Sequence, residues 1–175
     1  MNERRNSIVL GLIAGAAGVL VVLGATALII VYTGAYNVAA TEEHAAVTRW
    51  AFDTTFHHSV ERRAATFVPP DGLTPTAGAA AYKAMCQHCH AGPGVEQADW
   101  ASGMRPRPPH LMEAAADWEL SEVFWLVRHG VKMSGMPAFG PTHDDETIWS
   151  IAAFVKELPA MTPERYAALG GSQAQ

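Results

Sequence analysis

The sequence is poor in cysteine, in basic charge and in alternating patterns. Only two cysteines occur in its 175 residues, so no second cysteine pair is present to complete a structural zinc site. The 12 Lys and Arg against 17 Asp and Glu give a formal net charge of −5. This balance argues against a nucleic-acid-binding protein, which needs a basic face. No segment after residue 36 alternates with period two, so we expect an all-α domain.

What the sequence does contain, near its N-terminus, is an uncharged apolar run over residues 8–32. A helix of this length, at about 1.5 Å per residue, spans a bilayer core of roughly 30 Å. Arg4 and Arg5 precede the run, and basic residues favour the cytoplasmic side. We therefore expect residues 1–36 to be a single-pass anchor in the bacterial inner membrane. The N-terminus would be cytoplasmic and everything after residue 36 periplasmic.

A cleaved signal peptide is the alternative, because Val38-Ala39-Ala40 resembles a cleavage site. Secretory apolar regions usually have about 7–15 residues, much fewer than this run, so we favour an uncleaved anchor. In both cases the rest of the chain is exported to an oxidising compartment.

A Pro-rich stretch divides the exported part into two regions, residues 37–73 and residues 74–175. Residues 37–73 are expected to hold one helix, over 41–65, and then a Pro-rich linker. An imperfect apolar stripe predicts this helix: Val47, Trp50, Phe56 and Val60. The folded domain is expected over residues 74–175, with helices at 74–86, 111–116, 119–129 and 142–158. Thr74 and Thr142 are the expected N-caps, and Gly130 is expected to end the third helix.

Both cysteines lie in the stretch Cys86-Gln87-His88-Cys89-His90. A zinc site would need further ligands, a thioredoxin-like dithiol would follow a strand, and a simple disulfide leaves the adjacent histidine unexplained. One covalently bound haem c explains all three residues. Cys86 and Cys89 would form thioethers with its vinyl groups, and His90 would ligate its iron. We expect a carbonyl of residues 91–93 to hold the second ring nitrogen of His90, and His88 to face solvent.

One histidine leaves the sixth position on iron to a downstream residue. The candidates are Met104, His110, Met112, His129, Met133, Met136, His143 and Met161. Met136 is preferred, because Gly135 before it lets the backbone approach and Pro137 after it stiffens the loop. Met133 is the main rival. A sixth position that is open or ligated by histidine is the remaining alternative.

With its CQHCH and GMPAFG segments and a closing aromatic-rich helix, the stretch over residues 74–160 resembles a small class I cytochrome c. The resemblance implies an all-α fold around one haem with His/Met axial ligands. It further implies that Pro109 and Leu111 wall the haem. A close crossing of the first and last helices is also implied, at positions that match Gly78, Tyr82, Trp149 and Phe154.

Two filled axial positions favour electron transfer over chemistry at the iron, so we expect no enzyme. The first hypothesis is a membrane-tethered carrier that takes electrons from a quinol-oxidising complex or a periplasmic dehydrogenase to a terminal oxidase. The second is a fixed cytochrome c subunit of a respiratory oxidase or dehydrogenase complex. The third is a haem enzyme or gas sensor with a displaceable sixth ligand, although no second catalytic constellation is visible. The lipid bilayer is the remaining expected partner.

Overall fold

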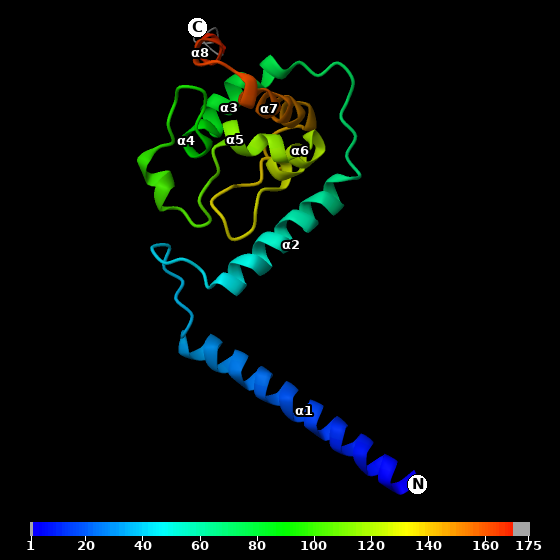
Figure 1. Ribbon diagram of the computed structural model, residues 1–175. Helices are drawn as coiled ribbons and strands as arrows, with labels where there is room; N and C mark the ends of the chain where they lie inside the picture. Colours follow the sequence, from blue (N-terminus) through cyan, green and yellow to red (C-terminus); the bar gives the residue numbers. More distant parts are fainter. Residues whose placement is uncertain (1, 170–175) are drawn as a thin grey trace. The chain divides into compact units, whose positions relative to one another are not determined.

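The computed structural model describes residues 2–169, and every regular element in this range is a helix. The expectation of an all-α chain is thereby confirmed for the described residues. Contacts divide the chain into two units, one ending at Glu42 and the other beginning at Glu43. Figure 1 shows the helices of both units along the chain.

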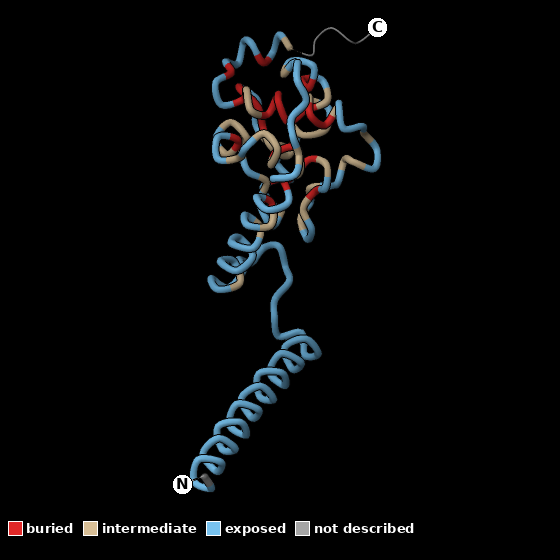
Figure 2. The backbone as a smooth tube through the Cα atoms, turned by 90° about the vertical axis from the view of Figure 1, so that its right-hand side faces the viewer, coloured by how far each residue is buried: buried red, intermediate tan, exposed pale blue. Residues whose placement is uncertain are grey.

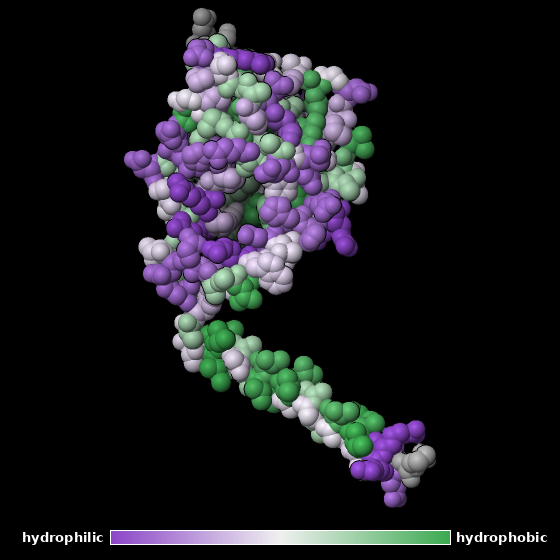
Figure 3. Space-filling model, viewed as in Figure 1, coloured by the Kyte–Doolittle hydropathy of each residue, from purple (hydrophilic) through white to green (hydrophobic). Residues whose placement is uncertain are grey.

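The first unit is built on α1, which runs from Asn2 to Thr33. Its 32 residues span about 48 Å, longer than a bilayer core of roughly 30 Å. Apolar side chains cover most of the face of this helix that Figure 3 shows. The helix is long and apolar enough to cross a membrane, so the expected N-terminal apolar helix is present.

The second unit opens with α2, Ala46–Ala64, which packs against α6, Leu120–His129. Val60 of α2 is buried, and the His57 ring stacks on Trp118 with centroids 5.0 Å apart. The first half of α2 is mostly exposed (Figure 2). The sequence pattern places residues 37–73 outside the folded domain, whereas these contacts join α2 to it.

The remaining elements are short, apart from α6 and α7. They are η1 Pro75–Gly78, α3 Ala79–Met85, α4 Gln87–His90, η2 Asp99–Gly103, α5 Leu111–Ala114, η3 Ala115–Asp117, α7 Asp145–Glu157, η4 Leu158–Ala160 and α8 Pro163–Ala168. The helix α6 ends as predicted, at Gly130 with a φ of 65°. The C-terminal helix α8 has no counterpart in the prediction.

Of the two predicted N-caps, Thr74 stands at the N-cap position of η1, whereas the prediction of Thr142 for α7 is wrong. The N-cap of α7 is Asp144, whose carboxylate accepts a hydrogen bond from the Thr147 amide at 2.8 Å. That bond lowers the pKa of Asp144. The Thr142 hydroxyl instead donates to the carbonyl of Phe139 at 3.2 Å. Thr74 precedes η1 but makes no side-chain cap bond. Either polar residue before α7 satisfies the cap pattern, so the pattern alone does not choose between them.

The core forms where α7 crosses the first helices, η1 and α3. Gly78 lies at this crossing, and a Cβ atom built on it would be 2.2 Å from the carbonyl oxygen of Ser150. The fully buried Tyr82 packs against Phe154, with ring centroids 5.5 Å apart. The close crossing that the resemblance implies is thus present.

The helix α6 also packs against α7. Trp149 is buried there and stacks on Phe124 of α6, with centroids 3.9 Å apart. Phe67, which lies just after α2, packs against the same Phe124 ring at 5.2 Å. Three segments far apart in the sequence therefore meet at one aromatic cluster.

Candidate functional site

Cys86 lies between α3 and α4, and Cys89 lies within α4; we call residues 86–90 the cysteine turn. The amides of Cys89 and His90 both donate to the Cys86 carbonyl, at 3.1 and 2.9 Å, so one tight turn positions all three side chains. Both thiols are half-buried and unpaired. Burial, with a smaller effect of Cys89, raises the pKa of the Cys86 thiol to about 12. A reactive dithiol needs a lowered thiol pKa, so this environment disfavours a thioredoxin-like role.

His90 is held by a backbone carbonyl, but not by the expected one. Its Nδ1 atom lies 2.9 Å from the carbonyl oxygen of Pro109, not from an oxygen of residues 91–93. With Nδ1 as the donor, Nε2 is the nitrogen left to bind a metal. Burial lowers the pKa of His90, which favours the neutral imidazole that a metal requires. His88 is exposed, as predicted.

Gln97 ties the motif to the segment that holds His90, and the sequence pattern does not single it out. Its Nε2 atom donates to the Cys89 carbonyl at 2.6 Å and to the Pro108 carbonyl at 2.9 Å. Pro109 is exposed, and Leu111, two residues later, is partly buried against the core. One glutamine side chain therefore fixes the distance between the cysteine turn and the histidine's acceptor.

A buried tyrosine holds the backbone just after the motif. The hydroxyl of Tyr82 donates to the Ala91 carbonyl at 2.8 Å. Ala91 has φ 62° and ψ −168°, a region that residues other than glycine rarely occupy. The surrounding structure must therefore impose this conformation, and the Tyr82 hydrogen bond is part of that restraint.

The helix α8 braces the same turn from outside. The Tyr166 hydroxyl donates to the Gln87 side chain at 2.6 Å, and its ring packs against Phe154. The Lys83 ammonium lies 4.5 Å from the Tyr166 ring centroid and donates to the carbonyls of Tyr166 and Leu169. Sequence reasoning missed this brace, because no periodic pattern connects α8 to the cysteine turn.

The loop after α6 folds back on itself and on the end of that helix. The Val131 amide donates to the Met136 carbonyl at 3.2 Å, and the Phe139 amide donates to the Val127 carbonyl at 3.1 Å. Inside the loop, the Met136 amide donates to the Ser134 hydroxyl at 3.1 Å. We call residues 130–140, which include the candidate ligands Met133 and Met136, the ligand loop. Its backbone is thus held before and after Met136.

The two methionines of the ligand loop lie in different surroundings. Met133 is 86% exposed and has a positive φ of 59°. Met136 is half-buried and packs against the hydrophobic core. Among the other candidates, His129 is exposed, Met161 is buried in the core, and Met104, His110, Met112 and His143 are half-buried.

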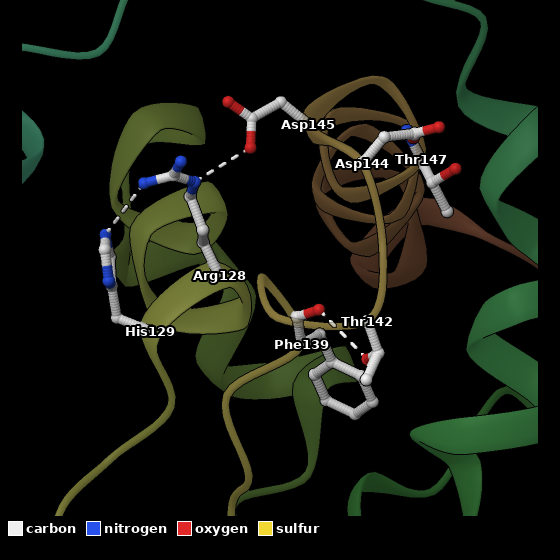
Figure 4. A network of polar contacts seen from close by, with 7 residues as sticks. All are labelled: Arg128, His129, Phe139, Thr142, Asp144, Asp145 and Thr147. Atoms are coloured by element: carbon white, nitrogen blue, oxygen red, sulfur yellow. Dashed lines mark hydrogen bonds and ion pairs between the residues drawn. The ribbon is translucent and has the colours of Figure 1, made fainter.

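A polar network fixes the far end of the ligand loop (Figure 4). Arg128 donates through Nε to Asp145 at 2.8 Å, and one of its terminal nitrogens lies 3.5 Å from His129. The Thr142 hydroxyl donates to the Phe139 carbonyl at 3.2 Å. These contacts join the end of α6, the end of the loop and the start of α7.

The side chains of the cysteine turn do not form a metal site by themselves. Within residues 2–169, no group of three His, Cys, Asp or Glu side chains could hold a metal ion. A zinc ion therefore finds no such ligand group in the described part of the chain. Two free thiols and an imidazole with one free nitrogen fit a covalently attached haem, which meets each at a different atom. Figure 3 shows a recess in the visible face of the second unit, with apolar residues inside it and polar residues around it.

A protein family model matches this part of the chain. Residues 74–155 match the family model described as cytochrome c oxidase, cbb3-type, subunit III. The match includes Cys86, Cys89, His90 and Met136, and leaves out α2 and α8. No curated protein and no solved structure matches the chain.

Proposed function

We propose that the chain is a membrane-anchored monohaem cytochrome c that carries single electrons, because residues 74–155 match a cytochrome c family model. The family match over the cysteine turn and the ligand loop is the observation that carries this proposal. The free thiols, the histidine with one nitrogen already bonded and the half-buried methionine support it.

Four side chains hold the haem in this proposal. Cys86 and Cys89 would form its thioethers, and His90 and Met136 would bind its iron. The burial of Met136, against the exposure of Met133, supports this choice of ligand. Pro109 and Leu111 form part of the haem wall. The Pro109 carbonyl has the added role of orienting His90.

The protein's part in electron transfer is to hold these groups still. When bound, the haem supplies an iron that cycles between ferrous and ferric states. The Pro109 carbonyl restrains the His90 ring, and Gln97 holds the preceding carbonyl, that of Pro108. The Ser134 hydroxyl and the Val131 amide restrain the backbone of Met136. Ligands that move little between two oxidation states keep the reorganisation small and exclude other molecules from the metal.

We further propose that α1 anchors the chain in the bacterial inner membrane, with the N-terminus cytoplasmic and the second unit periplasmic. The length and composition of α1 support the anchor, and Arg4 and Arg5 support the orientation. Its partners would be membrane-bound redox complexes, a quinol-oxidising complex or a terminal oxidase, or a periplasmic dehydrogenase. An anchor raises the concentration of the carrier near such complexes.

A fixed subunit of an oxidase complex is the second candidate function. The observation that favours it is the family match itself, because the matching family is described as a subunit of a cbb3-type cytochrome c oxidase. In this case α1 would pack against other membrane helices, and the electron would pass within one assembly.

Purification of the full chain in mild detergent, followed by a reduced-minus-oxidised spectrum, tests both functions. A c-type haem band alone, on a small particle, is expected for the tethered carrier. Additional b- or a-type bands at fixed stoichiometry would instead identify a subunit of a larger complex. A preparation without any c-type band would refute the proposed haem site.

Substitution of the proposed sixth ligand tests the haem ligation. Met136→Leu is expected to keep the haem, to lower the reduction potential and to open the iron to CO, because leucine has no sulfur to bind it. The matched control is Met133→Leu, which should change neither property because Met133 is exposed. A wild-type protein that binds CO readily would favour the gas-sensor alternative.

A further inference from the structure

We propose that Met104 is a positioning residue for the sixth ligand, because its side chain covers Gly135 and keeps the ligand loop closed. The proposal rests on the proposed function, in which Met136 binds the haem iron. It assigns a role in ligation to a residue more than thirty positions before the ligand, on a different loop.

The observation that carries the proposal is a close contact between two loops. Met104 follows η2 and belongs to the long segment between His90 and Pro109. Its side chain is half-buried, and its Cε atom lies 1.8 Å from the point where a Cβ atom on Gly135 would be. The methyl group of Met104 therefore fills the space that any side chain at position 135 would need, one residue from Met136.

The segment that carries Met104 is itself held in place. The Met104 amide donates to the Ala101 carbonyl at 3.2 Å, and Arg105 pairs with Glu43 at 3.4 Å. At the end of the segment, Pro109 accepts the hydrogen bond from His90. One segment thus bonds the histidine ligand directly and covers the neighbour of the methionine ligand.

This contact should affect how easily the methionine leaves the iron. A bound thioether is released when its loop opens locally, and the extent of opening depends on the contacts that are lost. Opening of the ligand loop would break the contact between the Met104 methyl group and Gly135, which opposes opening. Gly135 has no positive φ, so its backbone accepts alanine, and the flexible end of Met104 takes the clash.

The test uses imidazole as a competing ligand for the ferric haem of the full chain in detergent. Met104→Ala is expected to raise the apparent affinity for imidazole about tenfold, because less contact is lost on opening. Met104→Leu should stay close to wild type. Gly135→Ala should also raise the affinity, by displacing the Met104 methyl. Gly103→Ala is the matched control, since a Cβ atom there meets nothing within 4 Å.

The double variant separates this role from a general loosening of the fold. If Gly135→Ala acts only through Met104, it should raise the imidazole affinity little further when Met104 is already alanine. Additive effects, or an unchanged imidazole affinity in Met104→Ala, would overturn the proposal alone. The visible-light signature of sulfur ligation should be lost only in Met136→Leu. If it survives in Met136→Leu, the ligand assignment and this proposal both fall.

Discussion

A single methyl group on Gly78 tests how closely η1 and α7 must approach. The backbone there has φ −78° and ψ −10°, which alanine adopts without strain. The new Cβ atom would lie 2.2 Å from the Ser150 carbonyl oxygen and 2.7 Å from the Ile151 amide nitrogen. Both are backbone atoms of α7, so no rotamer change relieves the clash. Ordinary contacts are about 3.5 Å, so α7 must shift by about 1 Å.

Such a shift costs stability in two ways. Overpacking a tight contact costs about 1–3 kcal/mol, and the shift also loosens the packing of Tyr82 against Phe154. The better helix propensity of alanine offsets up to about 1 kcal/mol of this loss in the free energy of unfolding. We therefore expect Gly78→Ala to lower the free energy of unfolding by about 2 kcal/mol, and Tm by roughly 5–10 °C.

The measurement is a guanidinium titration of the haem-loaded full chain in detergent, followed by tryptophan fluorescence. Gly103→Ala provides the control, because the added methyl group meets open space there and should leave the midpoint unchanged. A Gly78→Ala midpoint equal to wild type would show that the crossing widens without cost. That result would refute the reasoning that this glycine is required for the helix crossing.

Three further variants test the frame around the site. Tyr82→Phe leaves the Ala91 carbonyl without its donor and should cost about 1–3 kcal/mol in a guanidinium titration; a wild-type midpoint would mean that another group replaces the hydroxyl. Burial raises the pKa of Tyr166 from 10.0 to about 12, so its protonated hydroxyl stabilises the fold below pH 10 and this stabilisation is lost as the pH rises to about 12. Tyr166→Phe should therefore flatten the fall of Tm between pH 10 and 12, and an equally steep fall would contradict this. Asp145→Asn removes the partly exposed pair with Arg128 and should cost less than about 1 kcal/mol, less still in high salt. A loss that grows with salt would exclude a simple ion pair.

Sequence patterns that lie within one segment predict the local structure of that segment well. The apolar spacing of α6 and its terminal Gly130 predict a helix and its end, and both are present. The resemblance to class I cytochromes c implies a close helix crossing at Gly78, which the structure also shows. The CQHCH stretch and the loop around Met136 indicate a haem site, and the family match covers both.

Contacts between distant segments could not be predicted in the same way. The acceptor for His90 is the backbone carbonyl of Pro109, and a carbonyl has no sequence signature. Gln97 is a single polar residue in a loop with no repeating pattern. The apolar stripe of α2 predicts a helix, but only the position of α6 decides that Val60 is buried while Trp50 stays exposed.

The packing of α2 against α6 determines how many residues connect α1 to the folded domain. If the domain began at residue 74, some forty residues would separate it from the end of α1 at Thr33. Because the second unit begins at Glu43, only residues 34–42 lie between the end of α1 and that unit. Nine residues reach at most about 32 Å, and a flexible chain of that length averages roughly 15–18 Å between its ends. In the proposed membrane-anchored carrier, so short a connection would keep the second unit near the membrane, and a docking site on a proposed partner complex there would meet it at about millimolar local concentration.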